Sequence, residues 1–149
     1  MALEQEVMQK MKEAMKAKDT VALASLRSIK SEILKAKTAS SNKEEMNEAD
    51  ELKLVQRLVK QRKDSAQTYK EQNREDLAES ELEEAKIIEQ FLPAQLTEEE
   101  IDKEVEDIIT TSGAESMKDM GKVMGLASQR LAGKADGKTI SKIVKQKLS

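Results

Sequence analysis

Apolar residues recur every three or four positions along almost the whole chain, with charged residues between them. This spacing is typical of amphipathic α-helices, because residues three and four positions apart share one helical face. The pattern and its interruptions predict seven helices. The first ends near Lys18, the third and longest runs from about 48 to 72, and the last follows Asp136.

The first two helices are predicted to form an antiparallel hairpin, with Asp19 as the N-cap of the second. Their apolar faces contain Leu3, Val7, Met11 and Met15, with Met8 and Ala14 alongside, then Ala22, Leu26, Ile29 and Ile33, with Leu34 widening the second face. The third helix has a wide apolar face, which predicts packing on both members of this hairpin.

Residues 38–47 are polar and are expected to form a loop, although Ser41 and Glu44 also fit a capping box that starts the third helix early. Asp76 and Glu79 predict the start of the fourth helix. Pro93 must end that helix, because the residue before a proline is disfavoured in helical conformation.

Pro93 also marks the predicted domain boundary, within the segment FLPAQLTEEEI. The expected fold is all-α, with an N-terminal four-helix antiparallel assembly over residues 1–92 and a small three-helix C-terminal bundle over residues 93–149. Thr97 and Glu100 form a capping box at the start of the fifth helix, and Gly113 suits its end.

The sixth helix has an apolar stripe beside a strip of small residues. The stripe contains Met117, Met120, Met124, Ala127 and Leu131. The methionines fit a core better than a peptide-binding groove. Gly121 and Gly125 leave the helix surface bare, so another backbone is expected to come close, either that of a neighbouring helix or that of a nucleic acid. The sequence favours neither partner.

Composition excludes several kinds of chemistry. The chain has 38% hydrophobic and 37% charged residues, 1% aromatic residues, and no cysteine or histidine. Thiolate nucleophiles, histidine-based zinc sites and catalytic triads are therefore excluded, and no cofactor or metal is expected. The carboxylate pairs fit solvated helix faces, and the GKADG turn lacks the spacing of a nucleotide-binding loop. The charged N-terminus and the lack of a long apolar stretch predict a cytoplasmic protein.

Charge is divided sharply within the last third of the chain. Residues 97–112 contain seven acids and one lysine, whereas residues 113–149 contain eight basic residues and three acids. Asp136 is expected to cap the last helix, with Ile140, Ile143, Val144 and Leu148 inward and lysines outward. The candidate nucleic-acid-binding residues are Lys118, Gly121, Lys122, Gly125, Lys134, Lys138, Lys142 and Lys145.

The run GKVMGLASQRLAGKADGKTISKIVKQKL resembles the C-terminal tail domain of the B subunit of glutamyl/aspartyl-tRNA amidotransferase. Together with LRSIKSEI, VKQRKDSAQTYKEQNREDLAESELEE and FLPAQLTEEEI, it makes the whole chain similar to the stand-alone YqeY-like proteins of the GatB/YqeY domain family.

The resemblance implies a tRNA-related accessory role, because the tail domain is associated with gripping tRNA away from the reaction centre. The implied partners are tRNA or another structured RNA, and proteins of aminoacyl-tRNA synthesis or the amidotransferase itself; no membrane or DNA partner is expected. The resemblance also implies a family label of carbon–nitrogen ligase activity that uses glutamine as amido-N donor. This label leaves open whether the chain is an enzyme, since the chain contains no identifiable catalytic residue. The alternative is a protein-interaction adaptor that uses the acidic fifth helix and the long third helix.

Overall fold

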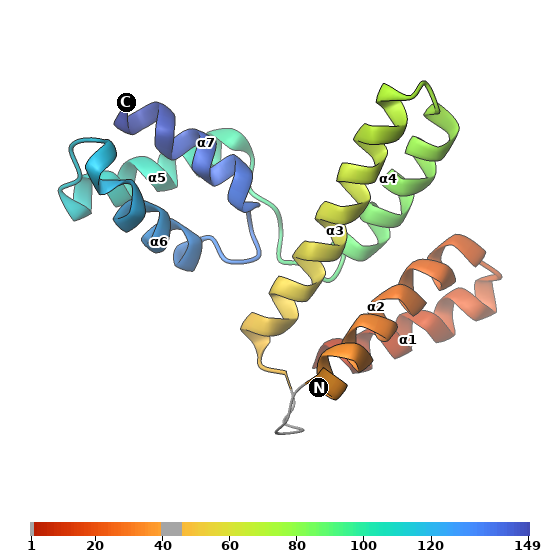
Figure 1. The fold of residues 1–149 in the computed structure, drawn as a ribbon. Helices are drawn as coiled ribbons and strands as arrows, with labels where there is room; N and C mark the ends of the chain where they lie inside the picture. The colour runs from red at the N-terminus through yellow and green to blue at the C-terminus, as the bar shows by residue number, and fades with distance from the viewer. Residues whose placement is uncertain (1, 40–45) are drawn as a thin grey trace. The chain divides into compact units, whose positions relative to one another are not determined.

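The fold is all-α throughout residues 2–39 and 46–149, which the computed structural model describes, and the predicted fold class is confirmed. The helices in chain order are α1 (Ala2–Ala17), α2 (Thr20–Ala39), α3 (Glu48–Glu71), α4 (Glu75–Glu89), α5 (Glu98–Ser112), the short 3-10 helix η1 (Met117–Asp119), α6 (Met120–Arg130) and α7 (Gly137–Leu148) (Figure 1). By their contacts they separate into two compact units, residues 1–92 and 93–149.

The first unit consists of two helical hairpins, α1–α2 and α3–α4 (Figure 1). Lys18 and Asn73 allow the tight turns within them by adopting left-handed conformations, with φ of 56° and 59°. The Oδ1 of Asp19 accepts a hydrogen bond from the backbone N–H of Ala22 at 3.0 Å, which confirms Asp19 as the N-cap of α2. Helix α4 packs against α3 and also against α2, so it joins the two hairpins.

The core of the first unit is aliphatic. Its buried residues are Leu3, Val7, Ala14, Leu26, Ile29, Ile33, Leu54, Val55, Leu58, Val59, Ala85 and Ile88. Met8, Met15 and Leu34 were predicted to lie on apolar faces, but all three are exposed. Since α2 is the main neighbour of α1, only one narrow stripe of α1 is covered.

Arg62 links three helices of this unit. Its Nε donates to Glu84 of α4 at 3.0 Å, and its Nη2 donates to Ser28 Oγ of α2 at 2.7 Å. The third helix meets α2 of the first hairpin, and near its start the Glu51 side chain bonds to the backbone of Leu3 in α1, so α3 contacts both members as predicted.

The predicted capping pair at Asp76 and Glu79 is wrong. Helix α4 starts after Arg74, which makes no side-chain capping bond, and Asp76 instead accepts hydrogen bonds from the Arg74 guanidinium at 3.3 Å. The N-cap of α3 is Asn47, whose Oδ1 accepts from the Asp50 N–H at 2.8 Å. The proposed early capping box at Ser41 and Glu44 lies outside the described residues.

The second unit is a three-helix bundle in which α5, α6 and α7 each contact the other two (Figure 1). Its buried core contains Ile101, Val105, Ile108, Val123, Ala127, Leu131, Ala135, Ile140, Ile143, Val144 and Leu148. Val123 is fully buried although it was not part of the predicted stripe, so the inward face of α6 includes Val123 as well as Met120, Met124 and Ala127.

Candidate nucleic-acid interface

Helix α5 is fixed at both ends by the signals present in the sequence. Thr97 Oγ1 accepts from the Glu100 N–H, and the Glu100 carboxylate accepts from the Thr97 N–H, both at 3.1 Å. Gly113 closes the helix in a left-handed conformation with φ of 73°. The predicted capping box and terminator are therefore confirmed, and they orient the acidic side chains of α5 within the bundle.

Two basic residues of the bundle are paired with these acids. On α6, the Arg130 guanidinium contacts Glu104 and Asp107, with N–O distances of 2.7 Å to each. On α7, Lys147 Nζ lies 2.8 Å from Asp102 Oδ1 and 3.8 Å from Glu106 Oε2. The hydrogen bonds with Asp107 and Asp102 raise the pKa values of Arg130 and Lys147 respectively.

The six candidate lysines differ from Arg130 and Lys147, since all six are exposed and none has an ion-pair partner among the described residues. They are Lys118, Lys122, Lys134, Lys138, Lys142 and Lys145. Lys122 Nζ donates to the backbone carbonyl of Ser112 at 3.3 Å, which leaves its charge uncompensated. Positive charge in this unit is thus divided into a paired set beside α5 and an unpaired set in solvent.

The unpaired lysines of α7 share one side of the helix. The Asp136 Oδ1 accepts from the Thr139 N–H at 2.7 Å, which confirms the predicted cap and sets the helical register. At about 100° per residue, Lys138, Lys142 and Lys145 point between about 140° and 180° away from Lys147. Because Lys147 faces α5, these three lysines face away from the acidic helix.

On α6, the two candidate glycines also point away from α5. Gly121 and Gly125 point about 180° and 140° away from Arg130, and hence away from the acids that it contacts. Both glycines are exposed, and an added Cβ at either position would meet no atom within 4 Å. The interpretation in which a neighbouring helix packs on the glycine strip is therefore wrong, and the strip is open.

The loop between α6 and α7 carries Lys134 and is held by the segment after Pro93. The Leu96 N–H donates to the Lys134 carbonyl at 2.9 Å, and Gln95 Nε2 donates to the Gly133 carbonyl at 2.7 Å. Gly133 adopts φ of 76°, so its lack of a side chain is needed for the turn. Gln95 was not singled out from the sequence; the only signal for it is a polar residue within the otherwise apolar run FLPAQL.

The methionines divide between core and surface. Met120 and Met124 are partly buried and pack on the core of the bundle, as predicted. Met117 lies in η1 and is 45% exposed, so its assignment to the core stripe is wrong. No group of three or more acids that would hold a metal ion occurs in residues 2–39 and 46–149. Among the same residues, no helix combines the length and hydrophobicity needed to span a membrane.

The fold and this surface define an all-α protein with a lysine-rich second unit. The chain belongs to the Yqey-like protein family, whose sequence profile matches residues 4–148. The predicted resemblance to YqeY-like proteins is confirmed.

Two curated yeast proteins, both named "Altered inheritance of mitochondria protein 41, mitochondrial", are similar to the chain. The protein of Kluyveromyces lactis is 36% identical over 105 residues, which cover 68% of this chain and 56% of that protein. The protein of Vanderwaltozyma polyspora is 34% identical over 116 residues, which cover 74% of this chain and 62% of that protein. The matched region is thus less than two thirds of either yeast protein.

Proposed function

We propose that the chain is a tRNA-binding accessory protein that holds structured RNA on the lysine face of its second unit. This face consists of the eight candidate residues, which are Lys118, Gly121, Lys122, Gly125, Lys134, Lys138, Lys142 and Lys145. The observation that carries the proposal is the separation of charge: the acids of α5 pair with Arg130 and Lys147, while the lysines on the opposite side of α7, together with Lys118, Lys122 and Lys134, remain unpaired and exposed.

The chemistry of this face favours a folded RNA read through its phosphates and its shape. Lysines provide point charges for phosphate oxygens, and the open glycine strip lets a sugar–phosphate backbone approach the helix. With aromatic residues at 1% of the chain, base-stacking platforms are scarce, which disfavours single-stranded RNA. The likeness to the amidotransferase tail domain supports tRNA as the RNA concerned.

The adaptor function is the second candidate, and the acidic helix α5 is less available for it than the sequence suggested. Asp102, Glu104, Glu106 and Asp107 contact basic residues of their own bundle, and Glu100 belongs to the capping box. We therefore favour RNA over an α5-mediated protein partner. The cellular compartment stays a prediction, because the mitochondrial label belongs to the yeast proteins.

Fluorescence anisotropy with labelled tRNA, measured across a series of salt concentrations, tests the proposal. Replacing Lys138 and Lys142 by Ala should weaken binding and reduce the slope of log K against log salt by up to about one unit per lost phosphate contact. The matched control replaces Lys60 and Lys70, two exposed and unpaired lysines of α3, and should leave both quantities unchanged. Equal binding by the Lys138/Lys142 variant and the parent at every salt concentration would refute the proposal and favour the adaptor.

The accessory role also implies that the chain does not catalyse amidation by itself, since it has no histidine, no cysteine and no nucleotide-binding loop. Incubation with glutamine, ATP and glutamyl-tRNA should yield no glutaminyl-tRNA. Turnover above a buffer blank would show that catalytic residues exist that neither the sequence nor the geometry reveals.

A further inference from the structure

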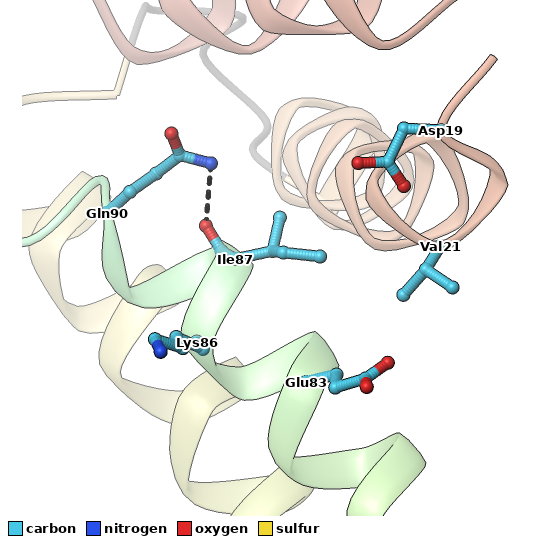
Figure 2. A pocket seen from close by; sticks show the side chains of 6 residues that line it. All are labelled: Asp19, Val21, Glu83, Lys86, Ile87 and Gln90. Carbon is cyan, nitrogen blue, oxygen red and sulfur yellow. Dashed lines mark hydrogen bonds between the residues drawn. The ribbon is translucent and has the colours of Figure 1, made fainter. Parts of the chain in front are cut away.

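The first unit contains an open groove of about 490 Å³ between the start of α2 and the exposed side of α4. It is lined by Asp19, Val21, Glu83, Lys86, Ile87 and Gln90. Figure 2 shows Val21 extending from α2 toward α4, and Ile87 extending from α4 toward α2. Val21 is 39% exposed, so the groove has an uncovered apolar floor.

The rim of this groove is acidic. Asp19 and Glu83 contribute two carboxylates against the single ammonium of Lys86, and Glu79 lies exposed one helical turn before Glu83. Neither Glu79 nor Glu83 has an ion-pair partner among the described residues, in contrast to Glu84 and Glu89 of the same helix, which pair with Arg62 and Lys63. The groove therefore suits an occupant that is apolar in the middle and positively charged at its edge.

A surface with that chemistry exists on the same chain, on the outer side of α1. Met8 and Met15 lie about two helical turns apart and are 43% and 60% exposed. They share a face of α1 with Lys12 and Lys16. None of the three acids of α1, all among the described residues, pairs with these lysines: Glu4 bonds to Lys37, Glu13 bonds to Lys10, and Glu6 has no ion pair with either lysine. We call Met8, Lys12, Met15 and Lys16 the α1 face.

We propose that the α1 face of a second copy of this chain occupies the α2–α4 groove. Flexible methionine side chains adapt to a shallow apolar floor such as that of Val21 and Ile87, and Lys12 and Lys16 are opposite in charge to Asp19 and Glu83. The two surfaces also lie close together in sequence, because Met15 and Asp19 stand on either side of the α1–α2 turn. We place the two chains about a twofold axis, which forms the same contact twice and closes the assembly as a dimer.

This inference is independent of RNA binding and is tested on the full chain without RNA, by sedimentation equilibrium at low salt. The parent is expected to dimerise with a dissociation constant of about 10–100 µM, as suits a small interface. Glu83→Lys and Lys12→Glu should each weaken the dimer at least about tenfold, because each places like charges at both contacts. Met15→Ser should weaken it through loss of apolar contact.

Mixing the two charge variants is the decisive measurement. In a mixed dimer of Glu83→Lys with Lys12→Glu chains, both contacts again join opposite charges, so dimerisation should return to the parental level. Glu115→Lys, a reversal at an exposed acid of the second unit, should leave the dimer unchanged. Circular dichroism of each variant separates a lost contact from a lost fold.

Two outcomes would overturn the inference. One is a parent chain that stays monomeric up to about 0.5 mM, which would leave the groove for another protein or for solvent. The other is a dimer that the charge variants do not weaken, or that mixing them does not restore, since the contact would then lie elsewhere.

Discussion

Lys147 Nζ lies 2.8 Å from the Asp102 Oδ1, and this contact ties the end of α7 to the acidic side of α5. Lys142, on the same helix, is exposed and has no ion-pair partner in the described part of the chain. Two lysines five positions apart on one helix therefore have different roles: Lys147 belongs to the fold, whereas Lys142 is available to a ligand.

This difference predicts opposite phenotypes for two alanine variants. Lys147→Ala should lower the free energy of unfolding by about 0.5–1 kcal/mol, the range for partly exposed ion pairs, and should change the salt slope of tRNA binding little. Lys142→Ala should leave stability within about 0.5 kcal/mol and flatten the salt slope. Urea denaturation and anisotropy on the same two preparations check both expectations. A stability loss in Lys142→Ala equal to that in Lys147→Ala would contradict them.

The pH dependence of the Lys147 contact follows from its raised pKa. Because the hydrogen bond with Asp102 raises the pKa in the folded state above its ordinary 10.5, the contact contributes fully at lower pH. Its contribution is lost as pH rises through the folded-state pKa. The stability difference between the parent and Lys147→Ala should therefore be constant from pH 7 to about 9 and should shrink in more alkaline solution.

Glu81 and Glu84 of α4 provide a second matched pair, because both lie near Arg62 but at different distances. Arg62 Nε is 3.0 Å from Glu84 Oε2 and 4.0 Å from Glu81 Oε2. Burial, followed by repulsion from Glu84, raises the pKa of Glu81. An acid with a raised folded-state pKa contributes most when protonated, and that contribution falls as pH rises through the folded-state pKa.

We therefore expect Glu81→Gln to leave stability at pH 7 unchanged or to increase it by up to about 0.5 kcal/mol. The substitution removes a carboxylate whose charged form is disfavoured by burial and by Glu84. Glu84→Gln should cost about 1–2 kcal/mol, since Arg62 loses its closest carboxylate while partly buried. Guanidinium denaturation at pH 7 measures both. A larger loss in Glu81→Gln than in Glu84→Gln would mean that Glu81 is the true partner of Arg62 in solution.

Local signals made much of the fold predictable. Thr97, Asp136 and Asp19 each accept the backbone hydrogen bond expected of an N-cap, because a cap depends on residues within one helical turn. Asp76 fitted the same rule but is not a cap, because α4 begins at Glu75 and Asp76 already lies within its first turn, where it pairs with Arg74.

Burial was harder to predict, because periodicity identifies an apolar face and does not show what covers it. Met15 and Leu34 fit the helical pattern yet lie exposed, since few neighbours cover the outer sides of α1 and α2. In the candidate site, the lysine side of α7 followed from spacing alone. The pairing of Arg130 and Lys147 with α5 could not be predicted from spacing, because the orientation of α5 depends on the tertiary packing of the bundle.

The boundary before Pro93 predicts that residues 93–149 fold on their own. Their core includes Ile101, Val105, Val123 and Val144, and all of the contacts between α5, α6 and α7 lie within the fragment. Such a small core gives marginal stability, so helical circular dichroism should be clear at low temperature and should melt early. Thr97→Ala should lower stability further by about 1 kcal/mol. A fragment without helical signal in the cold would show that the two units need each other to fold.

Gly125 allows stability and binding to be separated in one substitution. It lies inside α6, and a Cβ added there meets no atom within 4 Å. Gly125→Ala should therefore stabilise the second unit by about 0.5–1 kcal/mol, since alanine loses less backbone entropy in a helix. The same methyl group would prevent close approach of an RNA backbone to the strip. We expect tRNA affinity to fall about tenfold with an unchanged salt slope, because no charge is removed.

Gly113→Ala is the control, since its φ of 73° makes alanine unfavourable by about 1 kcal/mol and its position at the end of α5 lies outside the candidate site. Thermal denaturation should thus rank Gly125→Ala above the parent and Gly113→Ala below it, while anisotropy shows weakened binding for Gly125→Ala alone. If Gly125→Ala is more stable and binds tRNA as tightly as the parent, the open strip takes no part in RNA binding and the lysines must act without it.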